Sequence, residues 1–107
     1  MKKQNIILIG MPGAGKSSVG VILAKALGYE FIDTDLVIQH REKRLLREII
    51  ADEGNEGFLA IENEVNATLE ADKSVIAPGG SAIYGKEAME HFKEIGTIVY
   101  LKLSYED

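Results

Sequence analysis

Residues 10–17 read Gly-Met-Pro-Gly-Ala-Gly-Lys-Ser and match the G-x-x-x-x-G-K-[ST] pattern of a phosphate-binding loop. The run Asn-Ile-Ile-Leu-Ile at 5–9 is typical of a buried strand, and an amphipathic helical pattern starts at Ser18. Such a loop curls backbone N–H groups around phosphate oxygens at a helix N-terminus, where the dipole favours anions. The stretch therefore predicts a nucleoside-triphosphate site. The alternative interpretation is a glycine-rich turn followed by a solvated lysine.

The residue types in this loop suit a bound nucleotide. Its glycines allow a tight turn and a close approach of the backbone to the ligand. Lys16 is placed to reach the outer phosphates, and the Ser17 hydroxyl is placed to coordinate Mg²⁺. The residues expected to hold the nucleotide are Gly13, Ala14, Gly15, Lys16, Ser17 and Ser18.

Size and composition limit the classes of protein to consider. The chain has 107 residues, 46% hydrophobic and 27% charged, which predicts a single domain of ordinary composition. Its net charge is −5 and no basic cluster is interleaved with aromatic residues, so we expect no nucleic-acid partner. The apolar run before the loop is too short for a signal peptide or a membrane span. We therefore expect a cytoplasmic protein without membrane contact; its oligomeric state stays open.

Apolar runs alternate with helical patterns along the chain, which predicts βαβ units and a parallel sheet. Strands are expected at 5–9, 30–32, 74–77 and 97–103, and helices at 18–27, after 35, at 55–71 and at 86–94. Two helices show an apolar stripe with spacings of three and four residues. The first stripe contains Val19, Leu23, Ala26 and Leu27, and the second contains Phe58, Ile61, Val65 and Leu69.

Polar or glycine residues follow two of these strands at the carboxyl edge of the expected sheet, where ligands of open α/β folds bind. Asp33 and Asp35 could hold Mg²⁺ waters and accept a hydrogen bond from a substrate hydroxyl. Alternatively, Asp33 or Thr34 simply caps the next helix. Gly79 and Gly80 offer backbone N–H groups to a substrate anion or to the transferred phosphoryl group; the alternative is an ordinary Pro-Gly turn.

Together these segments resemble the shikimate kinase family, and the matching residues run from 7 to 103. The strand and D-T-D signature of that family matches Phe-Ile-Asp-Thr-Asp at 31–35. Gly54, Phe58 and Glu62 stand where its G-E-x-x-F-R-x-x-E segment has Gly, Phe and Glu, and 75–80 is similar to the strand before its triple-glycine turn. The resemblance implies ATP as donor and Mg²⁺ as cofactor, with Asp35 at the substrate hydroxyls and Asp33 near the metal.

The departures from the family pattern concern the substrate. The family arginine that binds the carboxylate of shikimate is Leu59 here, and leucine cannot form that charge-assisted pair. Either the acceptor differs, or another cation takes its place. The arginines available for that are Arg41, Arg44 and Arg47, and the third glycine of the turn is replaced by Ser81.

The end of the chain is a further departure. Residues 104–107 have the S-x-x-[DE] form that opens a helix, and nothing follows them. We expect a chain that has lost a C-terminal portion, although a polar tail is the alternative. In the resembled family the lid, with its arginine facing the phosphates, and the adenine-contacting segment lie beyond this point. Turnover by this chain is therefore expected to be poor.

These observations predict a three-layer α/β/α phosphate-loop fold with a parallel sheet of order 2-3-1-4, which can be incomplete at one edge. The function expected is ATP-dependent phosphorylation of a hydroxyl group on a small polar metabolite, shikimate or a related compound. Alternatives are a kinase of this fold with another acceptor and an inactive nucleotide-binding module. The residues expected to act are Lys16, Asp33 and Asp35 in catalysis, Asp35, Gly79 and Gly80 at the substrate, and Ser17 and Asp33 at the metal.

Overall fold

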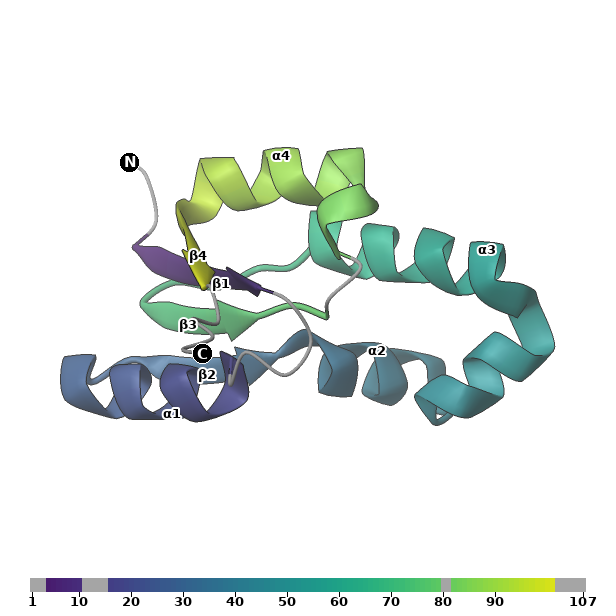
Figure 1. The fold of residues 1–107 in the computed structure, drawn as a ribbon, viewed down its shortest axis with the longest axis horizontal. Helices are drawn as coiled ribbons and strands as arrows, with labels where there is room; N and C mark the ends of the chain where they lie inside the picture. The colour runs from purple at the N-terminus through teal and green to yellow at the C-terminus, as the bar shows by residue number, and fades with distance from the viewer. Residues whose placement is uncertain (1–3, 11–15, 80–81, 102–107) are drawn as a thin grey trace, which may run out of the picture.

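A four-stranded parallel sheet forms the centre of the molecule (Figure 1). The computed structural model describes residues 4–10, 16–79 and 82–101, with 16, 17 and 83 described by their backbone alone. The strands, in sheet order, are β2 (Glu30–Asp33), β3 (Ser74–Ala77), β1 (Asn5–Gly10) and β4 (Gly96–Leu101). The predicted order 2-3-1-4 is confirmed.

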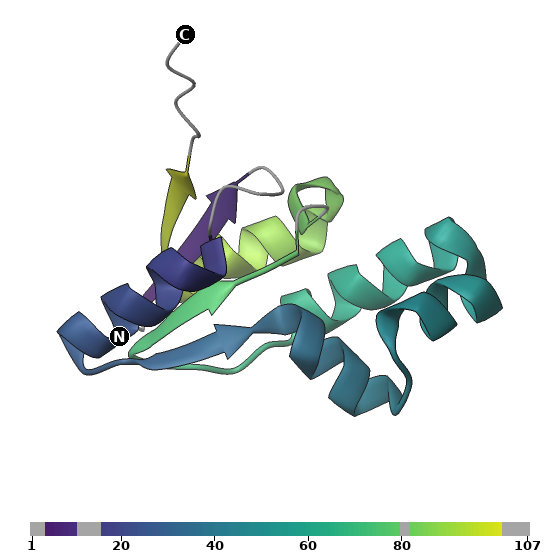
Figure 2. The same cartoon turned by 60° about the horizontal axis from the view of Figure 1, so that its bottom comes forward.

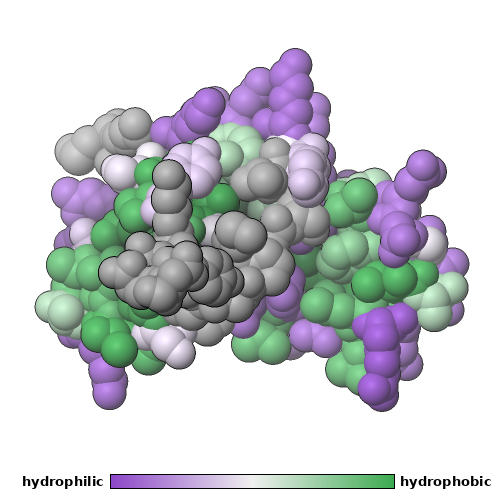
Figure 3. Space-filling model, in the orientation of Figure 1, coloured by the Kyte–Doolittle hydropathy of each residue, from purple (hydrophilic) through white to green (hydrophobic). Residues whose placement is uncertain are grey.

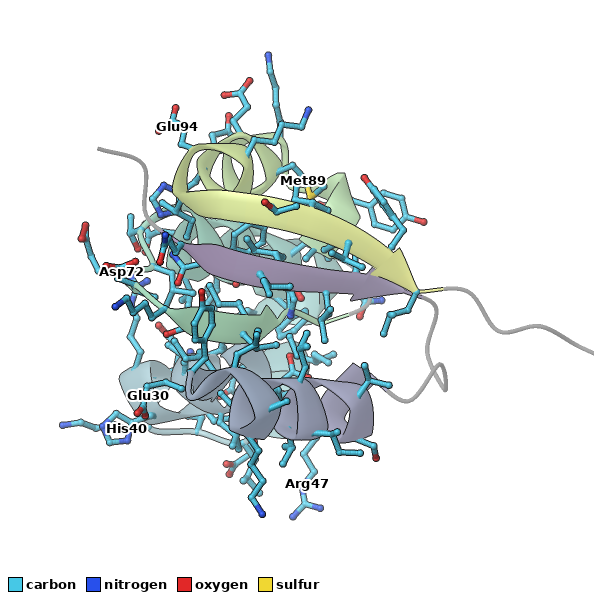
Figure 4. The ribbon with its side chains drawn as sticks, turned by 90° about the vertical axis from the view of Figure 1, so that its left-hand side faces the viewer. Glu30, His40, Arg47, Asp72, Met89 and Glu94 are labelled. Carbon is cyan, nitrogen blue, oxygen red and sulfur yellow. The ribbon has the colours of Figure 1, made fainter. Side chains whose placement is uncertain are left out.

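Strand β1 supplies the core on both faces of the sheet, because successive side chains of a strand point to opposite sides. Ile7 and Ile9 pack with Phe92 of α4 (Lys86–Ile95), whereas Leu8 packs with Ala24 of α1 (Lys16–Leu27). Figure 4 shows the sheet between these two helices. The predicted three-layer architecture is therefore present, and a short 3₁₀ helix, η1 (Ala82–Tyr84), precedes α4.

Two further helices form an arm that extends beyond the sheet (Figure 2). They are α2 (Thr34–Glu42), which follows β2 directly, and α3 (Leu46–Ala67), which leads back toward β3. Ile38, Ile49 and Val65 are buried between them. The arm has a small apolar core of its own, and this core fixes where α2 and α3 lie.

Helix α3 is longer than the sequence pattern predicted and is kinked at Gly54. It was expected at 55–71, but it begins at Leu46 and ends at Ala67. Gly54 has φ 75° and ψ 173°, a conformation that glycine adopts without the steric cost of a side chain. Of the predicted stripe, Phe58, Ile61 and Val65 pack together as expected. Leu69 lies beyond the helix and packs against the Ile7 cluster instead.

The predicted core face of α1 is only partly right. Gly20 and Ala24 are buried, whereas Val19 and Leu27 are largely exposed. A β-carbon at Gly20 would lie 2.5 Å from the Phe31 ring, so the missing side chain is what lets the helix approach the sheet so closely. Because α1 is apolar on most of its circumference, spacing alone did not identify the buried side. Apolar side chains consequently gather on the surface over α1 (Figure 3).

Candidate active site at the carboxyl ends of the strands

The parallel strands bring the candidate segments to one edge of the sheet. Asp33, the last residue of β2, pairs in register with Ala77, the last residue of β3. Strand β1 ends beside them at Gly10, and α1 starts at Lys16, so the N-terminus of α1 lies at this edge as well (Figure 2). A helix N-terminus favours anions. The edge therefore combines a phosphate-binding sequence with two candidate substrate segments.

Several predicted nucleotide-binding residues cannot be placed. Gly13, Ala14 and Gly15 lie outside the described residues, as does Gly80 at the substrate side. Lys16 and Ser17 occupy the first turn of α1, and the exposed Ser18 follows them. Their positions at the helix start are those that the loop pattern requires. Their contacts with a nucleotide stay predictions.

Asp33 caps helix α2. It has extended backbone angles, φ −98° and ψ 112°, and its Oδ1 accepts a hydrogen bond from the backbone N–H of Asp35 at 3.0 Å. This contact is the capping role that the sequence left open as an alternative. A carboxylate has two oxygens, and binding of a metal-coordinated water is compatible with one of them serving as a cap. The assignment of Asp33 to the metal stays a prediction.

Asp35 and Glu62 converge on Gly79. A β-carbon at Gly79 would lie 2.9 Å from Oδ1 of Asp35 and 2.9 Å from Oε2 of Glu62. The two oxygens are therefore no more than twice that distance apart, although they come from α2 and α3. Asp35 is half-buried and Glu62 is 2% exposed. The structure thus places two carboxylates and the backbone of Gly79 around one point, as hydrogen-bonding to a substrate hydroxyl requires.

Glu62 did not figure among the residues predicted for the site. Its match to a family segment was visible in the sequence, but its burial was not anticipated, although it lies beside Ile61 on the apolar stripe of α3. Burial of a carboxylate is costly unless polar groups surround it. A glutamate inside an otherwise apolar helical stripe is the signal that could have identified it.

A cavity of about 290 Å³ borders Glu62, with Leu59 in its wall. Two of the three arginines considered as substitutes for a cation at residue 59 are paired with acidic side chains. Arg41 forms an ion pair with Glu64, and Figure 4 shows Arg47 pointing away from the body of the molecule.

Arg44 holds three acidic partners of its own. It contacts Glu42 at 2.9 Å, Asp52 at 3.0 Å and Glu53 at 3.3 Å. The hydrogen bond to Glu42, followed by that to Asp52, raises the pKa of Arg44 above its usual value. The contacts of Arg41 and Arg44 thus give no support to the idea that either replaces a cation at residue 59.

The described residues contain no group of three or more His, Asp or Glu side chains that could hold a metal ion. Mg²⁺ keeps several waters and commonly uses one or two protein ligands together with substrate phosphates. One hydroxyl from Ser17 and one carboxylate from Asp33 match this small number of protein ligands. Among the same residues, no helix is both long and apolar enough to cross a bilayer.

Comparison with known proteins shows which family this chain resembles in sequence. The model of the shikimate kinase family matches residues 12–107. Shikimate kinase 2 of Yersinia enterocolitica is 41% identical over 101 residues, covering 94% of this chain and 58% of that protein. Shikimate kinase 2 of Yersinia pseudotuberculosis is 39% identical with the same coverage. The chain thus spans somewhat over half the length of these relatives.

Solved structures agree with the sequence comparison. A shikimate kinase from Acinetobacter baumannii in complex with shikimate superposes with a TM-score of 0.88 and 38% identity, over 95% of this chain and 57% of that one. The shikimate kinase from Aquifex aeolicus gives a TM-score of 0.81 and 36% identity, over 91% and 62%. A gluconokinase from Sinorhizobium meliloti, at 24% identity and a TM-score of 0.52, shares the fold alone.

Proposed function

This chain belongs to the shikimate kinase family, and we propose that it binds ATP with Mg²⁺ for the phosphorylation of a hydroxyl group on a small polar metabolite. The observation that carries the proposal is the convergence of Asp35 and Glu62 on Gly79, at the sheet edge where α1 begins. A phosphate loop alone is common to many nucleotide-binding proteins. Carboxylates gathered beside it are what a hydroxyl acceptor needs.

The nucleotide is held by the loop before α1. Backbone N–H groups of Gly13, Ala14 and Gly15 donate to phosphate oxygens, and the ammonium group of Lys16 neutralises the outer phosphates. Ser17 would supply a hydroxyl to Mg²⁺, Asp33 would contribute through water, and Ser18 follows them in the first turn of α1. ATP would supply the phosphoryl group, and the bound metal would supply positive charge that offsets the charge of the phosphates.

The acceptor is held at the opposite side of the same edge. Asp35 accepts the hydroxyl proton while the oxygen of the acceptor forms a bond to the γ-phosphorus. The bond between that phosphorus and the bridging oxygen of ADP breaks, which yields ADP and a phosphate ester. Backbone groups of Gly79 and Gly80 position the reacting group. The cap from Asp33 fixes the start of α2 and so the direction of Asp35.

The chain spans 58% of the length of its curated relatives, and we propose that its residues belong to one phosphate-loop kinase-like domain. Phosphoryl-transfer enzymes gain about 10³–10⁵ in rate from an arginine at the transferring group. Arg41 is paired with Glu64 and Arg44 with Asp52. By itself the chain should therefore bind nucleotide better than it turns it over.

A second candidate function is nucleotide binding without catalysis, which Leu59 and Ser81 favour because both alter the acceptor side. Coupled measurement of ADP release across a panel of hydroxyl compounds separates the two. Release that depends on the acceptor supports the kinase. Nucleotide binding without such release, in a protein that also carries the remaining two-fifths of the family domain, supports the binding module.

A further inference from the structure

Two buried polar side chains make no hydrogen bond among the described residues. The atoms concerned are the hydroxyl oxygen of Thr34 and both polar atoms of the Asn66 amide, Nδ2 and Oδ1. Both residues are 0% exposed, so bulk solvent does not reach them. Folded proteins rarely leave buried amides and hydroxyls without a partner, because their desolvation is then uncompensated. These three atoms therefore call for a partner inside the molecule.

Thr34 and Asn66 belong to neighbouring helices of the arm. Thr34 begins α2, one turn before Ile38, and Asn66 follows Val65 in the last turn of α3. Ile38 and Val65 pack together in the apolar core of the arm. Helix α2 leads away from the sheet, whereas the second half of α3 leads back to it (Figure 2). Moving from this apolar contact toward the sheet therefore leads to Thr34 on one helix and to Asn66 on the other.

The carboxylate pair places the two residues at the same junction independently. Asp35 and Glu62 meet at Gly79. Thr34 directly precedes Asp35, and Asn66 lies four residues after Glu62 on α3. Residues four apart share one face of a helix, so Asn66 is on the face that carries Glu62. The two polar side chains thus adjoin the carboxylate pair where the arm meets the sheet.

The hydrogen-bonding pattern at this junction suits water. The amide nitrogen of Asn66 donates, its oxygen accepts, and the hydroxyl of Thr34 does both. A partner from outside the chain cannot reach atoms of residues that are 0% exposed. Internal waters typically make about three hydrogen bonds to polar groups that the protein leaves unsatisfied. Water is also small enough to be enclosed where α2 and α3 pack.

We propose that Thr34 and Asn66 together bind internal water at the junction of the arm and the sheet. Water accepts from Nδ2 of Asn66 and donates to its Oδ1 and to Oγ1 of Thr34. The apolar cluster of the arm is distinct from the two clusters beside the sheet, and the bound water links the helices between them. It supports the first turn of α2 and the last turn of α3, beside Asp35 and Glu62. The proposal does not depend on the proposed function.

A crystal structure of the 107-residue chain, at a resolution that shows ordered water, tests the site directly. We expect density for water within hydrogen-bond distance of both Nδ2 of Asn66 and Oγ1 of Thr34. A dry site, or a direct hydrogen bond between the two side chains, overturns the proposal. This measurement needs no substitution, so it remains decisive if a variant fails to fold.

Substitutions of similar shape test whether the two residues share the water. Thr34→Val and Asn66→Leu should each raise the equilibrium constant of unfolding about tenfold, measured with denaturant. The double variant should fall well short of the roughly hundredfold rise that independent losses give, because either change removes the same water.

Matched controls are Thr97→Val and Asn55→Leu at exposed positions, which should change the constant by less than about threefold. Two outcomes contradict a shared water site. The first is an Asn66→Leu variant that is more stable than the wild type, as expected if the amide is simply unpartnered. The second is a double variant in which the two losses are fully additive.

Discussion

The side chain of Asp33 holds the backbone of Asp35: Oδ1 of Asp33 accepts a hydrogen bond from the N–H of Asp35 at 3.0 Å. This contact begins α2 at the end of β2 and so fixes where the Asp35 carboxylate emerges. Two aspartates that look equivalent in the sequence thus have different structural tasks. The first shapes the turn, and the second faces Gly79 together with Glu62.

Substitutions at these two aspartates should separate the tasks. Asp33→Ala should lower the free energy of unfolding by about 1 kcal/mol, as loss of a helix N-cap does, and Asp33→Asn should keep it because asparagine caps equally well. If Asp33 also serves the metal, Asp33→Asn should weaken the Mg²⁺ dependence of nucleotide binding.

Asp35→Asn should leave stability and ADP–Mg²⁺ binding nearly unchanged, while it cuts phosphoryl transfer in a protein that carries the whole domain. Denaturant unfolding and nucleotide titrations with and without Mg²⁺ measure these effects. Wild-type transfer rates in both variants would make the two carboxylates purely structural.

Lys16→Ala should abolish most of the rise in melting temperature that ADP–Mg²⁺ produces, because it removes the positive charge facing the phosphates. A ligand that binds only the folded chain stabilises it by RT ln(1 + [L]/Kd), so the shift reports affinity. Lys25→Ala, at the exposed far end of the same helix, is the control and should keep the full shift. An equal shift in the Lys16 variant would contradict the assigned phosphate contact.

Gly79→Ala should damage function more than stability. The new β-carbon would meet Asp35 Oδ1 and Glu62 Oε2 at 2.9 Å, and both are the far ends of side chains that can move aside. We expect a loss of about 1 kcal/mol in unfolding free energy, at the low end for overpacking, but displacement of both carboxylates from the acceptor. Acceptor binding by calorimetry should therefore fall, while nucleotide binding stays near the wild-type value. A variant that binds the acceptor normally would show that the carboxylate pair is not the acceptor site.

Asn63→Ala should destabilise α4, although Asn63 lies on α3. Its Oδ1 accepts the N–H of Ala88 at 3.0 Å, and its Nδ2 donates to Glu87, so one amide caps a neighbouring helix whose own N-cap residue is glycine. We expect a loss of about 1–2 kcal/mol. The pKa of Glu87, followed by NMR, should rise toward its ordinary value. Asn55→Ala on the exposed surface of the same helix is the control, with an effect of about 0.5 kcal/mol or less.

The helices and strands that local sequence patterns specify were the most predictable part of this fold. The continuous apolar run at 5–9 indicated a buried strand, and the phosphate loop after it indicated where α1 begins. The kink at Gly54 was missed because a helical apolar pattern continues on both sides of it. The buried side of α1 was misjudged because that helix is apolar nearly all round, so spacing carries little information about which side meets the sheet.

For the candidate site, the sequence by itself determined which chemical groups are present: a phosphate loop, an aspartate at the end of β2 and another two residues later, a glycine pair after β3, and leucine at residue 59. These follow from local sequence, because loop geometry and helix starts depend on neighbouring residues. Only the tertiary structure decided that Glu62 joins Asp35 at Gly79 and that Arg44 is occupied by Glu42, Asp52 and Glu53. The two carboxylates come from α2 and α3, and Gly79 follows the end of β3; they meet because parallel strand pairing and the apolar core of the arm bring distant segments together.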